Sequence, residues 1–116
     1  MLKRTHNCGQ LRATDVGKKV ILSGWVNSYR DHGNLVFIDL RDREGLTQLV
    51  FNPQTQQEMH STARDLRREW VIAASGTVEM RSAGMENPKL ATGQIEIVID
   101  QLEILNTAKT NDPSYL

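Results

Sequence analysis

If residues 34–41, NLVFIDLR, form a strand, side chains of different chemistry fall on the same face of it. In a strand, alternate side chains point to opposite faces, so the even-numbered aliphatic residues of this segment would face a core. Leu35, Phe37 and Asp39 then share the opposite face. An aromatic ring beside a carboxylate is either packed against the protein or available for stacking. For an isolated ring both interpretations stay open.

Three polar residues outside this segment fit a stacking site for unpaired bases. Aromatic rings bind single-stranded nucleic acid by stacking on bases, worth roughly 1–3 kcal/mol per base, and Leu35 would extend the apolar platform of Phe37. Arg30 suits a phosphate or a base face, and the Gln48 amide offers the donor and the acceptor that match uracil. The Glu96 carboxylate, which only accepts, suits the adjacent N–H groups of guanine. Otherwise, each would be an ordinary surface group.

Side chains for catalysis or metal binding are not grouped in this sequence. The histidines His6, His32 and His60 are scattered, and Cys8 is the single cysteine, so no metal-ligand spacing is present. A charged hairpin turn explains RDREG, residues 41–45, at least as well as a catalytic cluster does. No glycine-rich phosphate loop follows a strand. We expect a binding domain without catalytic residues, metal or cofactor.

Composition places the chain among soluble, single-domain proteins. The 116 residues are 24% charged and 39% hydrophobic, with no apolar run long enough to span a membrane. The start lacks the apolar stretch of a signal peptide, and one cysteine suits a reducing compartment, so a cytoplasmic protein is expected. Net charge is zero, although residues 1–50 hold eight Lys and Arg against five Asp and Glu. Any nucleic acid is therefore expected at a local site rather than through bulk charge.

Short runs of β-branched residues separated by glycines predict a mostly-β chain. Val20, Leu22 and Val26 share one face of the first strand, and Gly24 allows that strand to bend sharply. Five strands are predicted, over residues 18–30, 34–41, 46–51, 70–81 and 94–105.

One helix is predicted between the third and fourth strands. Asn52 can cap its first N–H groups, and Pro53 suits the first helical position. Met59, Ala63 and Leu66 recur at spacings of four and three, which forms a one-sided apolar stripe.

Three strands, a helix and two further strands are the order of an OB-fold. The fold class is therefore all-β, a five-stranded Greek-key barrel with one helix between strands 3 and 4. Its binding face spans strands 2 and 3, flanked by the loops between strands 1–2 and strands 4–5. Here those loops are residues 31–33 and 82–93, on either side of the strand that carries Phe37. Other small barrels fit the same pattern.

Several longer motifs resemble the start of bacterial-type aspartyl-tRNA synthetases. The match begins with RTHNCGQLRATDVGKKVILSGWVNSYRDHGNLVFIDLRDREGLTQLVFNP and continues in ARDLRREWVIAASGTV and TGQIEIVIDQLEILNTA. It covers roughly residues 4–109, and the RDREG hairpin favours the aspartyl type over the related lysyl and asparaginyl types.

The resemblance implies that residues 1–108 are the OB-fold that grips the tRNA anticodon loop, followed by an interdomain linker beginning at 109–116. The parent would be an ATP-dependent aspartate–tRNA ligase of class II and a homodimer. Its catalytic domain, with ATP and Mg²⁺, would lie outside this chain. The chain alone is then expected to have no aminoacylation activity.

Specific anticodon contacts follow from the resemblance. Phe37 would stack on the central base, a uracil, and Glu96 would read the first base, a guanine or its modified form. Gln48 would contact an anticodon base, and Arg30 would hold the loop backbone or a base. Arg67 is a further candidate for a phosphate contact.

Two loop residues resemble the non-discriminating form of the family, which charges both tRNA-Asp and tRNA-Asn. These are His32 and Gly84, and both also have ordinary structural explanations. The two tRNAs differ at the third anticodon base, so tolerance of that base would arise near these residues. The chain departs from the family at Ser28 and Tyr29, where arginines are usual, which should weaken phosphate attraction.

Three alternatives remain at the level of sequence. The chain can be a free-standing tRNA-binding relative of the domain, or a general single-strand-binding OB-fold. It can also be a structural or protein-interaction barrel, which predicts no affinity for RNA.

Overall fold

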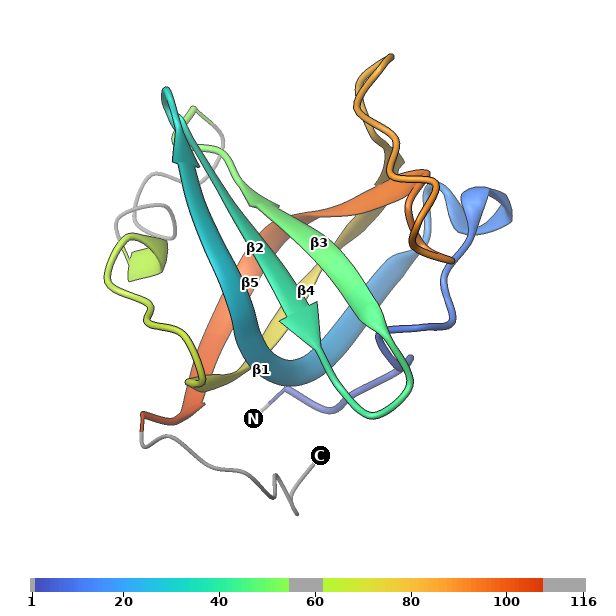
Figure 1. Ribbon diagram of the computed structural model, residues 1–116. Helices are drawn as coiled ribbons and strands as arrows, with labels where there is room; N and C mark the ends of the chain where they lie inside the picture. The colour runs from blue at the N-terminus through green and yellow to red at the C-terminus, as the bar shows by residue number, and fades with distance from the viewer. Residues whose placement is uncertain (1, 55–61, 108–116) are drawn as a thin grey trace.

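Five strands lie within two residues of their predicted ends in the computed structural model, which describes residues 2–54 and 62–107. They form a closed barrel in the order β1-β2-β3-β5-β4, antiparallel except between β3 and β5 (Figure 1). A 3₁₀ turn, η1 (Ala13–Asp15), precedes the barrel. The strands are β1 (Lys19–His32), β2 (Leu35–Arg41), β3 (Leu46–Phe51), β4 (Val71–Met80) and β5 (Ile95–Asn106).

A sharp bend lets β1 serve two sides of the barrel. Trp25 pairs with Val71 of β4 and with Arg41 of β2, so the strand changes partner there. A Cβ added at Gly24 would lie 2.3 Å from the Arg41 carbonyl oxygen, so only glycine allows this close approach. The predicted bend is confirmed, and it arises from contact rather than from unusual backbone angles.

The alternation expected for β2 is present. Its even-numbered aliphatic residues are fully buried, whereas Leu35, Phe37 and Asp39 are only partly buried. β5 follows the same rule, with Ile95 and Ile97 inside and Glu96 pointing outward. Every second side chain of these segments thus packs into the barrel interior, and the polar residues between them are left on the outer face.

The helix predicted between β3 and β4 is not shown. Residues 55–61, with Met59 among them, lie outside the described residues. Asn52 accepts a hydrogen bond from the backbone N–H of Gln54 at 2.9 Å, within a turn. Ala63 and Leu66 are buried as the apolar stripe predicted, but the described part of the connection passes into turns directly after Ala63.

The RDREG segment is a structural turn. Asp42 is buried, and its Oδ1 accepts hydrogen bonds from the N–H groups of Glu44 (2.7 Å) and Gly45 (3.1 Å). Its Oδ2 accepts another from the N–H of Cys8 at 2.8 Å, which ties the N-terminal segment to the hairpin. The Asp42 carboxylate of this segment therefore serves the fold.

Loop 82–93, between β4 and β5, is folded back on itself and fixed to the barrel. The N–H of Asn87 donates to the Gly93 carbonyl at 2.9 Å, and the Thr92 hydroxyl donates to the Leu46 carbonyl. The loop is thereby held beside the start of β3. Within the described residues, no helix has the length and apolar character needed to cross a membrane.

Candidate nucleic-acid interface

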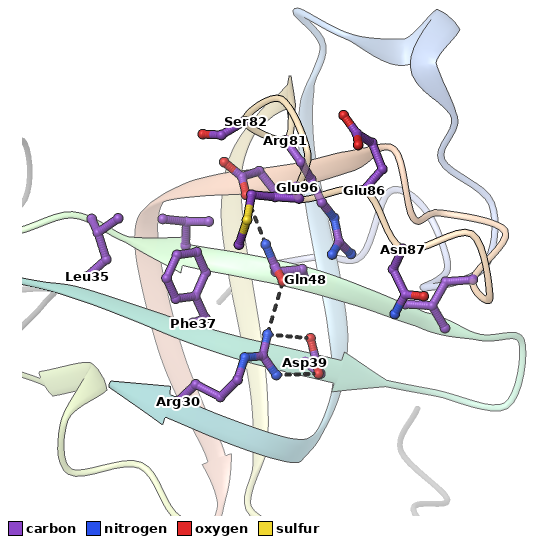
Figure 2. Close-up of a pocket in the computed structure, with 13 residues that line it drawn as sticks. Arg30, Leu35, Phe37, Asp39, Gln48, Arg81, Ser82, Glu86, Asn87 and Glu96 are labelled. Carbon is purple, nitrogen blue, oxygen red and sulfur yellow. Dashed lines mark hydrogen bonds and ion pairs between the residues drawn. The ribbon is translucent and has the colours of Figure 1, made fainter. Parts of the chain in front are cut away.

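A cavity of about 450 Å³ lies on the outer face of β2 and β3, and loop 82–93 forms one of its walls (Figure 2). Five of the residues predicted from sequence line it together: Arg30, Leu35, Phe37, Gln48 and Glu96. They come from four strands, so the barrel closure brings them to one place.

Strand register arranges the site in two rows across the sheet. Arg30 of β1 lies opposite Phe37 of β2, which lies opposite Val50 of β3. The next row consists of Ser28, Asp39 and Gln48. The first row therefore contains the aromatic platform, and the second contains polar groups.

The platform itself is apolar and partly open. The Phe37 ring is half-buried, and the cavity lining beside it includes Leu35, Val50 and the exposed Met85. The guanidinium carbon of Arg30 lies 6.0 Å from the centroid of the Phe37 ring, at the outer reach of a cation–π interaction. This geometry suits a planar, uncharged ligand such as a base.

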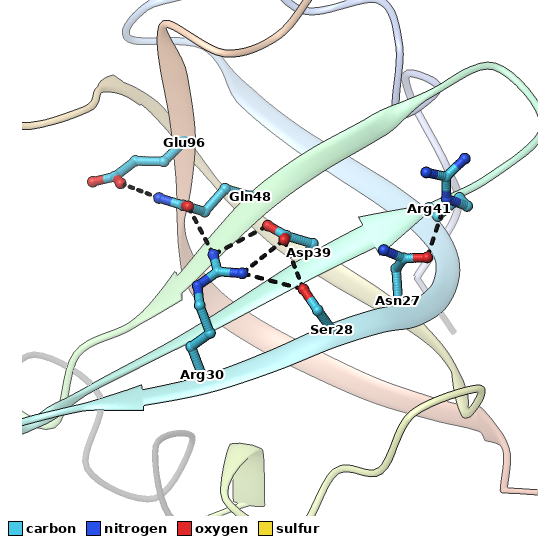
Figure 3. A network of polar contacts seen from close by, with 7 residues as sticks. All are labelled: Asn27, Ser28, Arg30, Asp39, Arg41, Gln48 and Glu96. Carbon is cyan, nitrogen blue, oxygen red and sulfur yellow. Dashed lines mark hydrogen bonds and ion pairs between the residues drawn. The ribbon is translucent and has the colours of Figure 1, made fainter. Parts of the chain in front are cut away.

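A chain of hydrogen bonds connects the polar residues (Figure 3). Gln48 Nε2 donates to Glu96 Oε1 at 2.9 Å, and Arg30 Nη2 donates to Gln48 Oε1 at 3.0 Å. Arg30 also forms a two-pronged ion pair with Asp39, at 2.7 and 3.2 Å. The free protein therefore holds these side chains in one arrangement before any ligand arrives.

The two carboxyl groups of the site have opposite pKa shifts. Burial raises the pKa of Asp39, but hydrogen bonds from Arg30 and Ser28 outweigh burial and hold the pKa below its ordinary value. Burial also raises the pKa of Glu96, and the hydrogen bond from Gln48 offsets it only in part. Asp39 is thus stabilised as a carboxylate by the hydrogen bonds it accepts from Arg30 and Ser28. The hydrogen bond that Glu96 accepts from Gln48 does not compensate for its burial.

Sequence reasoning missed Arg81, which follows the end of β4. Only 8% of this residue is exposed, and its Nε donates to the Ile95 carbonyl at 3.0 Å. Its Nη2 is buried and has no hydrogen-bond partner among the described groups. Figure 2 shows the side chain reaching toward the cavity, which it lines. A buried donor without a partner is rare, and an acceptor on a ligand would satisfy it.

Burial lowers the pKa of Arg81, although Asp39 and Glu96 partly offset this effect. The sequence did contain one signal for Arg81, because this residue directly precedes the loop expected to flank the binding face. Among the described residues, no group of three His, Cys, Asp or Glu side chains is placed to hold a metal ion.

Three predicted residues do not line the cavity. His32 is exposed at the end of β1, where it pairs with Leu35. Gly84 lies in the loop next to cavity-lining residues and has a φ of 84°. Arg67 lies apart from the cavity, and its Nη1 donates to three carbonyl oxygens of the preceding turn, at 3.0 to 3.4 Å.

Comparison with known proteins places the chain in a family. Residues 20–105 match the tRNA anti-codon family, described as an OB-fold nucleic acid binding domain. The chain belongs to this family. The predicted OB-fold is therefore confirmed, and the cavity lies on the face that OB-folds use for single-stranded nucleic acid.

Two curated relatives cover nearly the whole chain. The aspartate–tRNA(Asp/Asn) ligase of Desulfotalea psychrophila is 59% identical over 109 residues, and that of Desulfatibacillum aliphaticivorans is 55% identical over 109 residues. In both cases the match covers 94% of this chain but only 18% of the relative. The chain is thus an OB-fold of the anticodon-binding type, similar to the N-terminal part of these ligases.

The solved structures agree on the fold. The asparaginyl-tRNA synthetase of Pyrococcus horikoshii superposes with a TM-score of 0.76 at 25% identity, covering 94% of this chain and 24% of that protein. The resemblance to tRNA synthetases noted in the sequence is thereby supported by sequence and by structure.

Proposed function

We propose that this domain reads the anticodon loop of tRNA-Asp on behalf of an aspartyl-tRNA synthetase. The observation that carries the proposal is the half-buried Phe37 ring, which faces a cavity rather than the core. Around it stand donors and acceptors suited to base edges, and the two similar ligases described above are named for tRNA(Asp/Asn).

The three positions of the anticodon fit different parts of the cavity. Phe37 stacks on the central uracil, next to the Gln48 amide, which offers a donor and an acceptor. Glu96 accepts hydrogen bonds from the first base, a guanine, through lone pairs that Gln48 does not occupy. Arg81 donates its unpartnered Nη2 to an acceptor of the RNA.

Acceptance of tRNA-Asn as well as tRNA-Asp is part of the proposal. We place the contacts to the third base near His32, at the end of β1, and near Gly84, in loop 82–93. Neither residue lines the cavity itself, which is consistent with loose discrimination at that base. Arg67, outside the cavity, would contact a phosphate of the anticodon arm.

The catalytic work belongs to a part of the parent protein that this chain does not span. The matched ligases are more than five times longer than the matched region. In the parent we place an ATP- and Mg²⁺-dependent class II catalytic domain, joined through a linker at 109–116, in a cytoplasmic homodimer. Residues 108–116 lie outside the described residues.

The test is a titration of the domain with three anticodon stem-loops at one fixed salt concentration. They contain GUC, GUU and a control anticodon with the first guanine and the central uracil replaced. We expect tight and similar binding of GUC and GUU and weaker binding of the control. Equal binding of all three would instead support a general single-strand-binding protein, and no binding would support a structural barrel.

A matched pair of variants sharpens this test. Glu96→Gln removes the carboxylate that faces the cavity, and Glu79→Gln removes the carboxylate opposite it in β4, which is exposed and does not line the cavity. Only Glu96→Gln should reduce the preference for guanine at the first position. Equal effects of the two variants would contradict the assignment of Glu96.

A further inference from the structure

Arg30 is committed to protein partners in the free domain. Its Nη1 donates to Asp39 Oδ2 at 2.7 Å and to Ser28 Oγ at 3.1 Å. Its Nη2 donates to Asp39 Oδ1 at 3.2 Å and to Gln48 Oε1 at 3.0 Å. A guanidinium has five N–H donors, so these bonds account for four of them. Arg30 thus forms a clamp that bonds Ser28, Asp39 and Gln48, and these bonds compete with any bond from Arg30 to a phosphate.

Ser28 completes this clamp. Its hydroxyl donates to Asp39 Oδ2 at 2.6 Å while it accepts the bond from Arg30. The pairing of β1 with β2 shifts register between Val26 and Ser28, and the shift sets Ser28 directly opposite Asp39. A hydroxyl group thus supports the acidic residue from β1, next to the bond that the acidic residue receives from Arg30.

The clamp fixes the orientation of the Gln48 amide. Its oxygen must face the Arg30 donor, and its NH₂ group must face the Glu96 acceptor, because the reverse orientation would lose both bonds. One hydrogen of the NH₂ group and one lone pair of the oxygen then remain for a ligand. That pair of one donor and one acceptor matches the edge of a uracil.

The charged residues around the cavity also favour a site for bases over a site for phosphates. The lining includes two arginines, Arg30 and Arg81, and three carboxylates, Asp39, Glu86 and Glu96. This is not the excess of positive charge expected for a groove that binds mainly phosphates. Asp39 in particular neutralises Arg30, which lies beside the Phe37 ring.

We propose that Asp39, supported by Ser28, is a positioning residue that makes the site select bases rather than phosphates. Asp39 holds Arg30 away from the RNA backbone, and through Arg30 it sets the orientation of the Gln48 amide. This role rests on the proposed function of the cavity. It also makes a distinctive prediction. Loss of Asp39 should reduce selectivity for the anticodon bases while it increases the attraction for RNA of any sequence.

The test compares Asp39→Asn and Ser28→Ala with Asp31→Asn as a matched control. Asp31 is on the same strand as Ser28 but pairs with Arg64 at 3.4 Å, and it does not line the cavity. Both aspartate variants remove one negative charge. Each protein is titrated with the GUC stem-loop and with the control stem-loop at several salt concentrations, and its melting temperature is recorded.

In Asp39→Asn we expect the control stem-loop to bind more tightly and the ratio of GUC to control affinity to fall about tenfold, the size of one misplaced hydrogen-bonding pair. The slope of log affinity against log salt should become steeper by roughly 0.7, the value for one additional phosphate contact on a single strand. Ser28→Ala should lower the ratio by a smaller factor, and Asp31→Asn should leave the ratio unchanged.

An affinity ratio that is unchanged in both Asp39→Asn and Ser28→Ala would overturn the positioning role. So would an equal fall in Asp31→Asn, because the effect would then be one of net charge alone. Uniform weakening of both stem-loops would indicate a structural role and would also overturn it. A wild-type domain without preference for GUC contradicts the proposed function itself, so the two failures are distinguishable.

Discussion

The two phenylalanines of the chain, Phe37 and Phe51, separate binding from folding. Phe37 is half-buried on the outer face of β2, and Phe51 is fully buried at the end of β3. Truncation of Phe37 to alanine removes the stacking platform but leaves no closed cavity in the core. Truncation of Phe51 to leucine leaves a void inside the barrel and changes nothing on the binding face.

Phe37→Ala should lower RNA affinity more than stability, and Phe51→Leu should lower stability more than RNA affinity. Stacking of a base is worth about 1–3 kcal/mol, so Phe37→Ala should weaken binding of the GUC stem-loop by about 5- to 150-fold. Its cost to the free energy of unfolding should be about 1 kcal/mol, typical of a residue outside the core. Phe51→Leu should cost about 1–3 kcal/mol of unfolding free energy and little affinity in the molecules that remain folded.

Both quantities are measured on the same samples. Fluorescence anisotropy with labelled GUC stem-loop gives the Kd, and thermal unfolding gives the stability, with about 4–8 °C of Tm for each kcal/mol in a domain of this size. Affinity loss in Phe51→Leu equal to that in Phe37→Ala would refute the assignment of Phe37 as a contact residue. Unchanged affinity in Phe37→Ala would refute it as well.

Other consequences of the structure are testable individually. Because burial holds the pKa of Glu96 above its ordinary value and guanine needs the carboxylate, affinity for GUC should fall as pH is lowered through that raised pKa. Titrations from neutral pH down through the ordinary glutamate range should show the fall beginning above the pH at which a free glutamate takes up its proton, and a pH-independent affinity would contradict it. Gly93→Ala would place a Cβ 1.7 Å from the Asn87 carbonyl oxygen, so the loop must open and RNA affinity must drop. The control is Gly17→Ala, outside the cavity, whose added Cβ meets no atom within 4 Å and which should cost about 1 kcal/mol of stability through its positive φ while RNA affinity is kept. Equal RNA affinities of the two glycine variants would argue against loop 82–93 as a wall of the binding site. Burial raises the pKa of the Cys8 thiol, so a thiol reagent should label it only as fast as the domain unfolds, and rapid labelling of the native domain would show otherwise.

Strand positions were predictable because they depend on local pattern. The period-two burial of β2 and β5 is written in consecutive residues, so the phase of Phe37 and of Glu96 followed from counting alone. Once β2 and β3 are paired, their register places Gln48 opposite Asp39, beside the row that contains Phe37. Alternation alone therefore places Phe37 and Glu96 on the outer face, whereas Gln48 also needs the pairing of β2 with β3.

The remaining features depend on distant parts of the chain. Arg81 lines the cavity together with loop 82–93, which folds back beside β3, and no local pattern encodes that contact. The bonds of Ser28 and Arg30 to Asp39 depend on an irregular step in the β1–β2 register. Sequence reasoning left Arg30 open between a phosphate and a base, because it could not show that the Asp39 carboxylate already pairs with it.

The central claim is that RNA binds on the outer face of β2 and β3, and amide NMR during titration tests it most directly. The ¹⁵N-labelled domain is titrated with the GUC stem-loop, and shift changes are mapped by residue. We predict the largest changes at Phe37, Gln48, Arg81 and Glu96, with saturation at one stem-loop per domain. Changes centred instead on the turn around Arg67, with the cavity residues unmoved, would contradict the account.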